Sequence, residues 1–181
     1  MSIIVILLFL IFPLFSCELT AQTYRSNMLR IYGDVSSIYW SDNSGNKTNL
    51  YGTGIAYDRG IIGSGLSYGG KLGYVVNGGF NINNLLYIQP TIRYFFKKPM
   101  EGFYSGLGIS GGFGNLNVKN KMQTFLSVQA GAGYLFIVDV KYRVGFYLMP
   151  GWCRIQREGV IIDGINVMGG VTAGYKFIDT R

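Results

Sequence analysis

The chain has 181 residues, a length that suggests one domain, and its formal net charge is +7. Glycine contributes 27 residues, well above the usual share of about 7%, whereas charged residues make up only 14% of the chain. This composition excludes a disordered chain, which would be more highly charged, and it argues against helical bundles and coiled coils because glycine destabilises helices. The sequence contains no histidine, which removes histidine-based catalysis and metal binding.

Residues 1–21 have the order of a secretory signal peptide. Their apolar run, residues 2–16, is too short for a typical membrane-spanning helix, and small or polar residues follow it. We expect signal peptidase to cut after Ala21, so that residues 22–181 form the mature domain. Two alternatives stay open. Leu14-Phe15-Ser16-Cys17 is a loose lipoprotein box, so Cys17 could become a lipidated N-terminus; and no Lys or Arg precedes the apolar run, as it does in a normal signal, so the segment could stay as an uncleaved anchor.

The mature chain alternates between apolar and polar residues with the period of two that is typical of β-strands. In residues 140–152, for example, Val144 and Phe146 share one phase, whereas Lys141 and Arg143 lie in the other. Seven segments behave in this way, and their apolar phase contains no charged residue. Together with one less regular segment, they predict strands over residues 28–40, 53–68, 71–82, 85–96, 102–114, 123–136, 139–153 and 164–177.

The two faces of these strands indicate a transmembrane barrel. Aromatic residues such as Tyr39, Tyr142 and Tyr175 lie near the ends of the apolar phase, and the charged residues lie in the opposite phase. An apolar outer band that is bordered by aromatic residues and encloses polar ones is typical of bacterial outer-membrane barrels. A soluble, lipocalin-like barrel, the alternative, would need many outward charged residues. We therefore predict an all-β fold: an eight-stranded antiparallel transmembrane β-barrel with meander topology.

Residues 50–70 interrupt this pattern. The apolar phase changes from odd to even positions near Asp58-Arg59-Gly60. The change indicates either a β-bulge within one strand or a turn between two short strands. We expect the bulge, because these barrels have even strand numbers and the bulge gives eight strands where a turn would give nine. Pro90 and Pro150 are expected to kink their strands locally.

Three stretches resemble a known class of proteins. The closing AGYKF (173–177), IRYFF (92–96) and GFYSGLGISGGFG (102–114) are similar to strands of the small eight-stranded outer-membrane barrels of bacteria, the OmpX, OmpW and OmpA-transmembrane class. The resemblance is one of pattern, covers nearly all of residues 27–177, and carries no functional residue over. It implies a monomer in the bacterial outer membrane, in contact with outer-membrane lipid and lipopolysaccharide, that requires the barrel-assembly machinery during biogenesis.

The inward phase predicts a polar lumen. Its candidate polar cluster consists of Arg30, Asp34, Arg93, Lys141 and Arg143. We expect Asp34 and Asp58 each to neutralise an inward Arg or Lys and not to form a carboxylate pair, because buried charges need partners. Eight strands leave an interior just wide enough for side chains, so we expect a closed, electropositive lumen without an open pore.

Three larger loops are predicted at one end of the barrel, over residues 41–48, 115–121 and 154–163. Basic side chains make this rim a candidate surface for lipopolysaccharide phosphates through charge-assisted hydrogen bonds. The candidate contacts are Lys119, Lys121, Arg154 and Arg157. The alternative is that these are ordinary solvated loop charges. Nucleic-acid binding is not expected of an exported protein.

The sequence predicts no catalytic, cofactor or metal site. Residues 106–111 spell G-x-G-x-x-G, but no helix follows them, as a dinucleotide site would require. The missing histidine excludes a Ser-His hydrolase and a histidine metal site. We therefore expect a non-enzymatic outer-membrane protein with a structural or surface-interaction role. Two alternatives stay open: a barrel that binds or transports a small apolar ligand through a lateral gap near the two prolines, and an envelope enzyme with unfamiliar catalytic residues.

Overall fold

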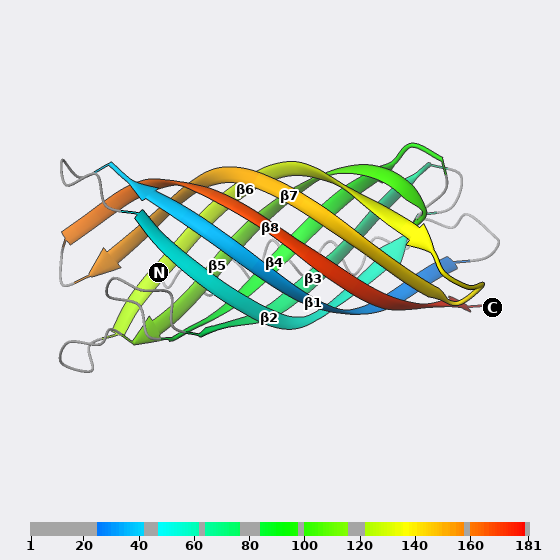
Figure 1. Ribbon diagram of the computed structural model, residues 1–181, viewed down its shortest axis with the longest axis horizontal. Coiled ribbons are helices and arrows are strands. Elements are labelled where there is room, and N and C mark those ends of the chain that lie inside the picture. The colour runs from blue at the N-terminus through cyan, green and yellow to red at the C-terminus, as the bar shows by residue number, and fades with distance from the viewer. Residues whose placement is uncertain are drawn as a thin grey trace.

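The computed structural model describes residues 25–41, 47–61, 64–76, 84–97, 100–115, 122–157 and 160–179; the predicted signal peptide lies outside them. These residues form eight strands: β1 (Arg25–Trp40), β2 (Lys47–Gly60), β3 (Leu66–Val76), β4 (Asn84–Phe95), β5 (Gly102–Asn115), β6 (Met122–Ile137), β7 (Tyr142–Arg157) and β8 (Val160–Asp179). Each strand is antiparallel to the next and β8 pairs with β1, so the sheet closes into a barrel (Figure 1). The predicted eight-stranded antiparallel meander is confirmed. Among the described residues, no helix is long and apolar enough to span a membrane.

The strands run obliquely to the long axis of the barrel (Figure 1). If paired residues are followed once around the sheet from Met28, the path returns to β1 at Ile38. This displacement is the shear that a tilted, closed sheet requires. The resulting barrel is narrow, and the inward side chains fill it.

The predicted bulged strand over residues 53–68 is wrong. β2 ends at Gly60 and β3 begins at Leu66, so the phase change in the sequence marks a turn. Gly65 in this turn has a φ of 68°, a left-handed conformation that glycine adopts without steric cost. The strand total is still eight because the described part of the strand predicted over residues 71–82, residues 71–76, is the second part of β3.

One predicted loop is also largely wrong. The connections after β1, β3, β5 and β7 lie together at one end of the barrel, here called the loop end, because successive strands alternate in direction. The predicted loops over residues 41–48 and 115–121 belong to this end, although most of their residues lie outside the described ones. Residues 154–163, in contrast, are mainly strand: β7 continues to Arg157 and β8 begins at Val160. The opposite end, where β2 turns into β3, is called the turn end.

The outer face of the barrel is apolar, as the alternation predicted. Ile31 and Val171 are each 64% exposed and Leu107 is 60% exposed, whereas apolar side chains in the core of a soluble protein are buried. Near the turn end, aromatic rings contact one another across strands, for example Tyr57 and Phe177, whose centroids are 6.4 Å apart. An apolar band with an aromatic girdle suits the hydrocarbon and the interface of a bilayer.

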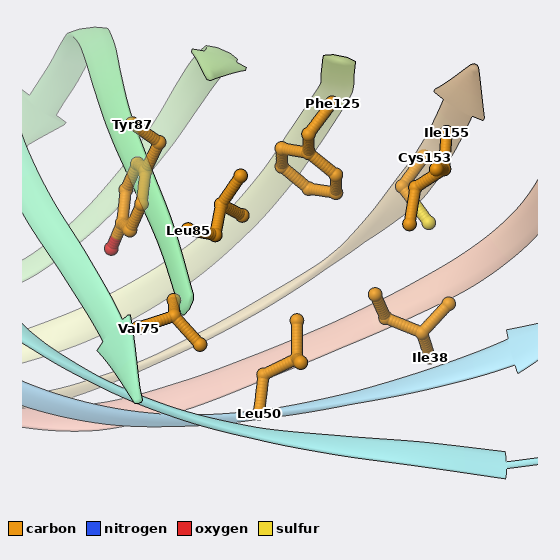
Figure 2. Close-up of a cluster of buried hydrophobic side chains, with 8 residues drawn as sticks. All are labelled: Ile38, Leu50, Val75, Leu85, Tyr87, Phe125, Cys153 and Ile155. Carbon is orange, nitrogen blue, oxygen red and sulfur yellow. The ribbon is translucent and has the colours of Figure 1, made fainter. Parts of the chain in front are cut away.

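The lumen contains two clusters of apolar side chains. Figure 2 shows the first, near the loop end, with its side chains gathered inside the barrel. It consists of Ile38, Leu50, Val75, Leu85, Tyr87, Phe125, Cys153 and Ile155. The second consists of Met28, Phe95, Met100, Tyr104, Leu135, Tyr147, Met149 and Met168. Along β4, the buried Gln89, Thr91 and Arg93 lie between Tyr87 of the first cluster and Phe95 of the second, which marks a polar layer between the clusters.

Pro90 and Pro150 interrupt the ladder without splitting their strands. Pro90 pairs with Gly70 of β3, but β4 and β5 have no paired residues at that level; Pro150 pairs with Val167 of β8, but β6 and β7 have none. Proline lacks the N–H group that a ladder hydrogen bond needs, so one neighbour is lost at each position. Both interruptions border the β5–β6 hairpin, one on each side.

Candidate functional site: the polar lumen

Four of the five predicted lumen residues lie inside the barrel. Arg30, Asp34, Arg93 and Arg143 are all buried. Lys141 does not belong to the cluster, and its prediction is wrong: it is exposed and lies in the turn before β7, with its Nζ 5.8 Å from the ring centroid of the outward-facing Tyr175. The alternation in the sequence continues past the strand into this turn, so periodicity alone placed the strand start too early.

A three-residue ion cluster is centred on Asp58 of β2. Its Oδ2 accepts a hydrogen bond from Arg30 Nε at 2.6 Å, and its Oδ1 accepts one from Arg93 Nη1. The Asp58 side chain is 1% exposed and the two guanidinium groups are nearly as buried. One carboxylate therefore serves two cations, in agreement with the expectation that Asp58 neutralises inward basic residues.

A second cluster joins Asp34 of β1 to Lys71 of β3. Lys71 Nζ donates to Asp34 Oδ2 and lies 3.7 Å from the centroid of the Tyr32 ring. The hydroxyl groups of Tyr87 and Tyr147 donate to the same carboxylate oxygen at 3.2 and 3.1 Å. Sequence reasoning missed Lys71 because the strand predicted to begin there alternates only weakly, with glycines in both phases. Once the turn is placed, Lys71 shares the inward phase of β3.

A pair of side-chain amides spans the inner face of β5. Gln89 Nε2 on β4 donates to Gln129 Oε1 on β6 at 2.7 Å. The bond passes over Gly108, where a Cβ atom would lie 2.7 Å from Gln89 Nε2. A side chain there would displace the Gln89 amide, so Gly108 leaves room for the bond between the two amides.

A third ion cluster lies at the turn end. Glu101, just before β5, accepts hydrogen bonds from Arg143 Nη2 and Lys176 Nζ, both at 2.9 Å. Partial burial alone would raise the pKa of Glu101, but the two cationic donors outweigh it and hold that pKa below its usual value. The neighbouring Met100 is fully buried and has a φ of 65°. Glu101 escaped sequence reasoning because it lies outside the alternating segments.

The lumen cavities that the described residues line are small. Two cavities measure about 20 and about 10 Å³, room for roughly one water molecule each. The larger lies beside the first apolar cluster, near the loop end, from here on called the loop-end cluster. The smaller lies within the polar layer between the two apolar clusters, from here on called the charged layer. In the described part of the chain, no group of three or more His, Cys, Asp or Glu side chains could hold a metal ion.

The predicted lipopolysaccharide contacts are only partly visible. Lys119 and Lys121 lie outside the described residues, as does the side chain of Arg157. Arg154 is on the outer face of β7 and forms two hydrogen bonds with Asp163 of β8, Nε to Oδ1 at 2.8 Å and Nη2 to Oδ2 at 3.1 Å. Its guanidinium carbon lies 5.0 Å from the ring centroid of Trp152.

No protein-family model matches the chain, and no curated protein matches it in sequence. Several solved structures, in contrast, are similar to it in fold. Neisserial surface protein A is 13% identical, with a TM-score of 0.53 over 86% of this chain and 100% of that chain. The N-terminal β-barrel domain of Pseudomonas aeruginosa OprF is 18% identical (TM-score 0.46; 83% and 97% covered), and Yersinia pestis Ail, crystallised with the heparin analogue sucrose octasulfate, is 16% identical (TM-score 0.47; 86% and 100%). The similarity to Neisserial surface protein A concerns the fold alone. Together with the closed sheet and the apolar outer face, it identifies the fold as that of a small, eight-stranded outer-membrane β-barrel.

Proposed function

We propose that this protein is a non-enzymatic barrel of the bacterial outer membrane, with a closed lumen and a structural or surface-interaction role in the cell envelope. The observation that carries the proposal is the combination of an apolar outer face with a lumen filled by paired charges and packed side chains. Such a molecule is stable in a bilayer and offers little free volume inside.

Two features of the lumen argue against the alternatives. Asp34 and Asp58, the buried carboxylates, are each saturated by cationic or hydroxyl donors and are almost inaccessible to a substrate. The cavities of about 20 and 10 Å³ are far below the roughly 300–1,000 Å³ of typical ligand pockets. These features favour a role at the surface of the barrel over catalysis or small-molecule transport.

The surface role that the chemistry favours is contact with lipopolysaccharide at the loop end. Arg154 is engaged by Asp163, which lowers its value as a phosphate ligand. Lys47, in contrast, has no carboxylate partner among the described residues, and its Nζ lies 5.4 Å from the ring centroid of Tyr39 at the membrane interface. We therefore add Lys47 to Lys119, Lys121 and Arg157 as proposed contacts with lipid phosphates.

Cell fractionation combined with gel mobility tests this proposal. The protein expressed in a Gram-negative host should appear in the outer membrane, migrate differently before and after boiling, and begin at Gln22 if the signal is cut after Ala21. Planar-bilayer recordings should show no porin-sized conductance. Recovery in the soluble or inner-membrane fraction would overturn the localisation, and a stable large conductance would overturn the closed lumen.

A further inference from the structure

The smaller lumen cavity has an unusual lining. Three buried cations, Arg30, Lys71 and Arg93, line it together with Gln89 and Tyr147, whereas neither Asp34 nor Asp58 does. We call this space the cation chamber. Its charged lining groups are all hydrogen-bond donors, so its interior is electropositive even though each cation also contacts a carboxylate that does not line the chamber.

Each of the two guanidinium groups has N–H donors that form no hydrogen bond with a described residue. Arg30 uses Nε and Nη2 for Asp58, and Arg93 uses Nη1. No hydrogen bond joins Arg30 Nη1 or Arg93 Nη2 to a described residue, and neither atom is among the fully buried, unpaired polar atoms. These N–H groups therefore border space that a water-sized particle can reach.

The charges around the chamber do not balance. Three buried cations face two buried carboxylates, Asp34 and Asp58, which leaves one positive charge in excess. An uncompensated charge in a low-dielectric interior is costly, and a bound counter-ion removes that cost. The chamber measures about 10 Å³, which suits a single-atom ion and excludes phosphate, sulfate or a carboxylic acid.

We propose that the cation chamber binds one small monovalent anion of the size of chloride, held by the free N–H groups of Arg30 and Arg93. Lys71 attracts the ion by its charge alone, because its Nζ already donates to Asp34, Tyr147 and Met168. The ion is a buried structural counter-ion of the barrel. This inference does not depend on which surface role the protein has.

Thermal unfolding of the detergent-folded barrel tests the proposal, with gel mobility as the readout of folded protein. The wild type is compared in sodium bromide and in sodium gluconate at equal ionic strength, since gluconate is too large for the chamber. A bound halide should raise the unfolding midpoint by an amount on the order of a few degrees. The Arg93→Leu variant has two cations and two carboxylates around the chamber, so its midpoint should be the same in both salts.

The matched control is Arg154→Leu, which removes a cation from the outer face and should keep the full halide effect. Equal midpoints of the wild type in the two salts, or an undiminished halide effect in Arg93→Leu, would overturn the proposal. If Arg93→Leu does not fold, bromide anomalous diffraction from wild-type crystals decides the matter. A peak between Arg30, Lys71 and Arg93 supports the ion, and water density without an anomalous signal refutes it.

Discussion

The loop-end cluster and the charged layer below it fill the same narrow barrel by different physical means. Ile38, Leu85 and their neighbours are buried apolar side chains that need no specific partner. Asp58 and the two guanidinium groups around it are just as buried, but each depends on the others for its charge. The two regions should therefore respond very differently to small changes: the apolar cluster gradually, in proportion to the surface lost, and the charged layer abruptly, when one partner of a pair disappears.

The largest effect is expected at the centre of the charged layer. Asp58→Asn keeps the shape of the side chain but leaves Arg30 and Arg93 without a counter-charge. Removing one partner of a buried ion pair typically costs about 3–5 kcal/mol. We expect a loss of this size in the free energy of unfolding, measured by urea titration of the barrel folded in lipid vesicles.

A triple variant sharpens this result. Replacing Asp58, Arg30 and Arg93 together by Leu removes the whole cluster, and buried ion clusters can often be exchanged for apolar residues without loss. The triple variant should therefore be more stable than Asp58→Asn alone. If both lose the same amount, the cost of Asp58→Asn comes from packing and not from unpaired charge.

The next effect tests whether charge is tolerated outside the lumen. Val171 is 64% exposed on the outer face of β8 and is paired with Gly33 of β1 and Phe146 of β7, neither of which can pair with a cation. Val171→Arg should cost roughly 2–4 kcal/mol in vesicles, as an Arg at the midplane does in barrels of this kind. Val171→Leu, the matched control, should be nearly neutral. A cost as small for Arg as for Leu would mean that this face of the strand does not contact lipid.

The sequence predicts the parts of this contrast that depend on neighbouring residues in the chain, and it misses the parts that depend on contacts between distant residues. Alternation is a local property, so it predicted the outward face around Val171 and the burial of Arg30 and Arg93. It failed where it continued beyond a strand, at Lys141, and where glycines in both phases weakened it, next to Lys71. The partners themselves lie far apart in the chain, such as Arg30 and Asp58, and are set by strand register. Register follows from the positions of the turns, which the alternation did not resolve.

A smaller loss is expected in the loop-end cluster. Ile38 is completely buried there, and Ile38→Val removes one methyl group from the packed lumen. Such a change typically costs about 0.5–1.5 kcal/mol. Asp58→Asn removes a charge but no volume, so comparing the two substitutions separates the cost of lost charge from the cost of lost packing. The contrast between the two regions fails if the two substitutions destabilise the vesicle-folded barrel equally in urea.

The smallest effect concerns Glu101 at the turn end, where the charged cluster is partly open to solvent. Its side chain is 21% exposed, so we expect Glu101→Gln to cost only about 0.5–1 kcal/mol at neutral pH. Because Arg143 and Lys176 hold the pKa of Glu101 below its usual 4.5, the carboxylate stabilises the folded state above pH 4.5, and this contribution is lost as the pH falls through the folded pKa. Wild type and Glu101→Gln should therefore differ at pH 7 and converge in acid. Asp163→Asn, which breaks the exposed pair with Arg154 at the loop end, controls for the loss of any one carboxylate. A difference between wild type and Glu101→Gln that stays constant from pH 7 into acid would show that Glu101 acts through its shape and not through its charge.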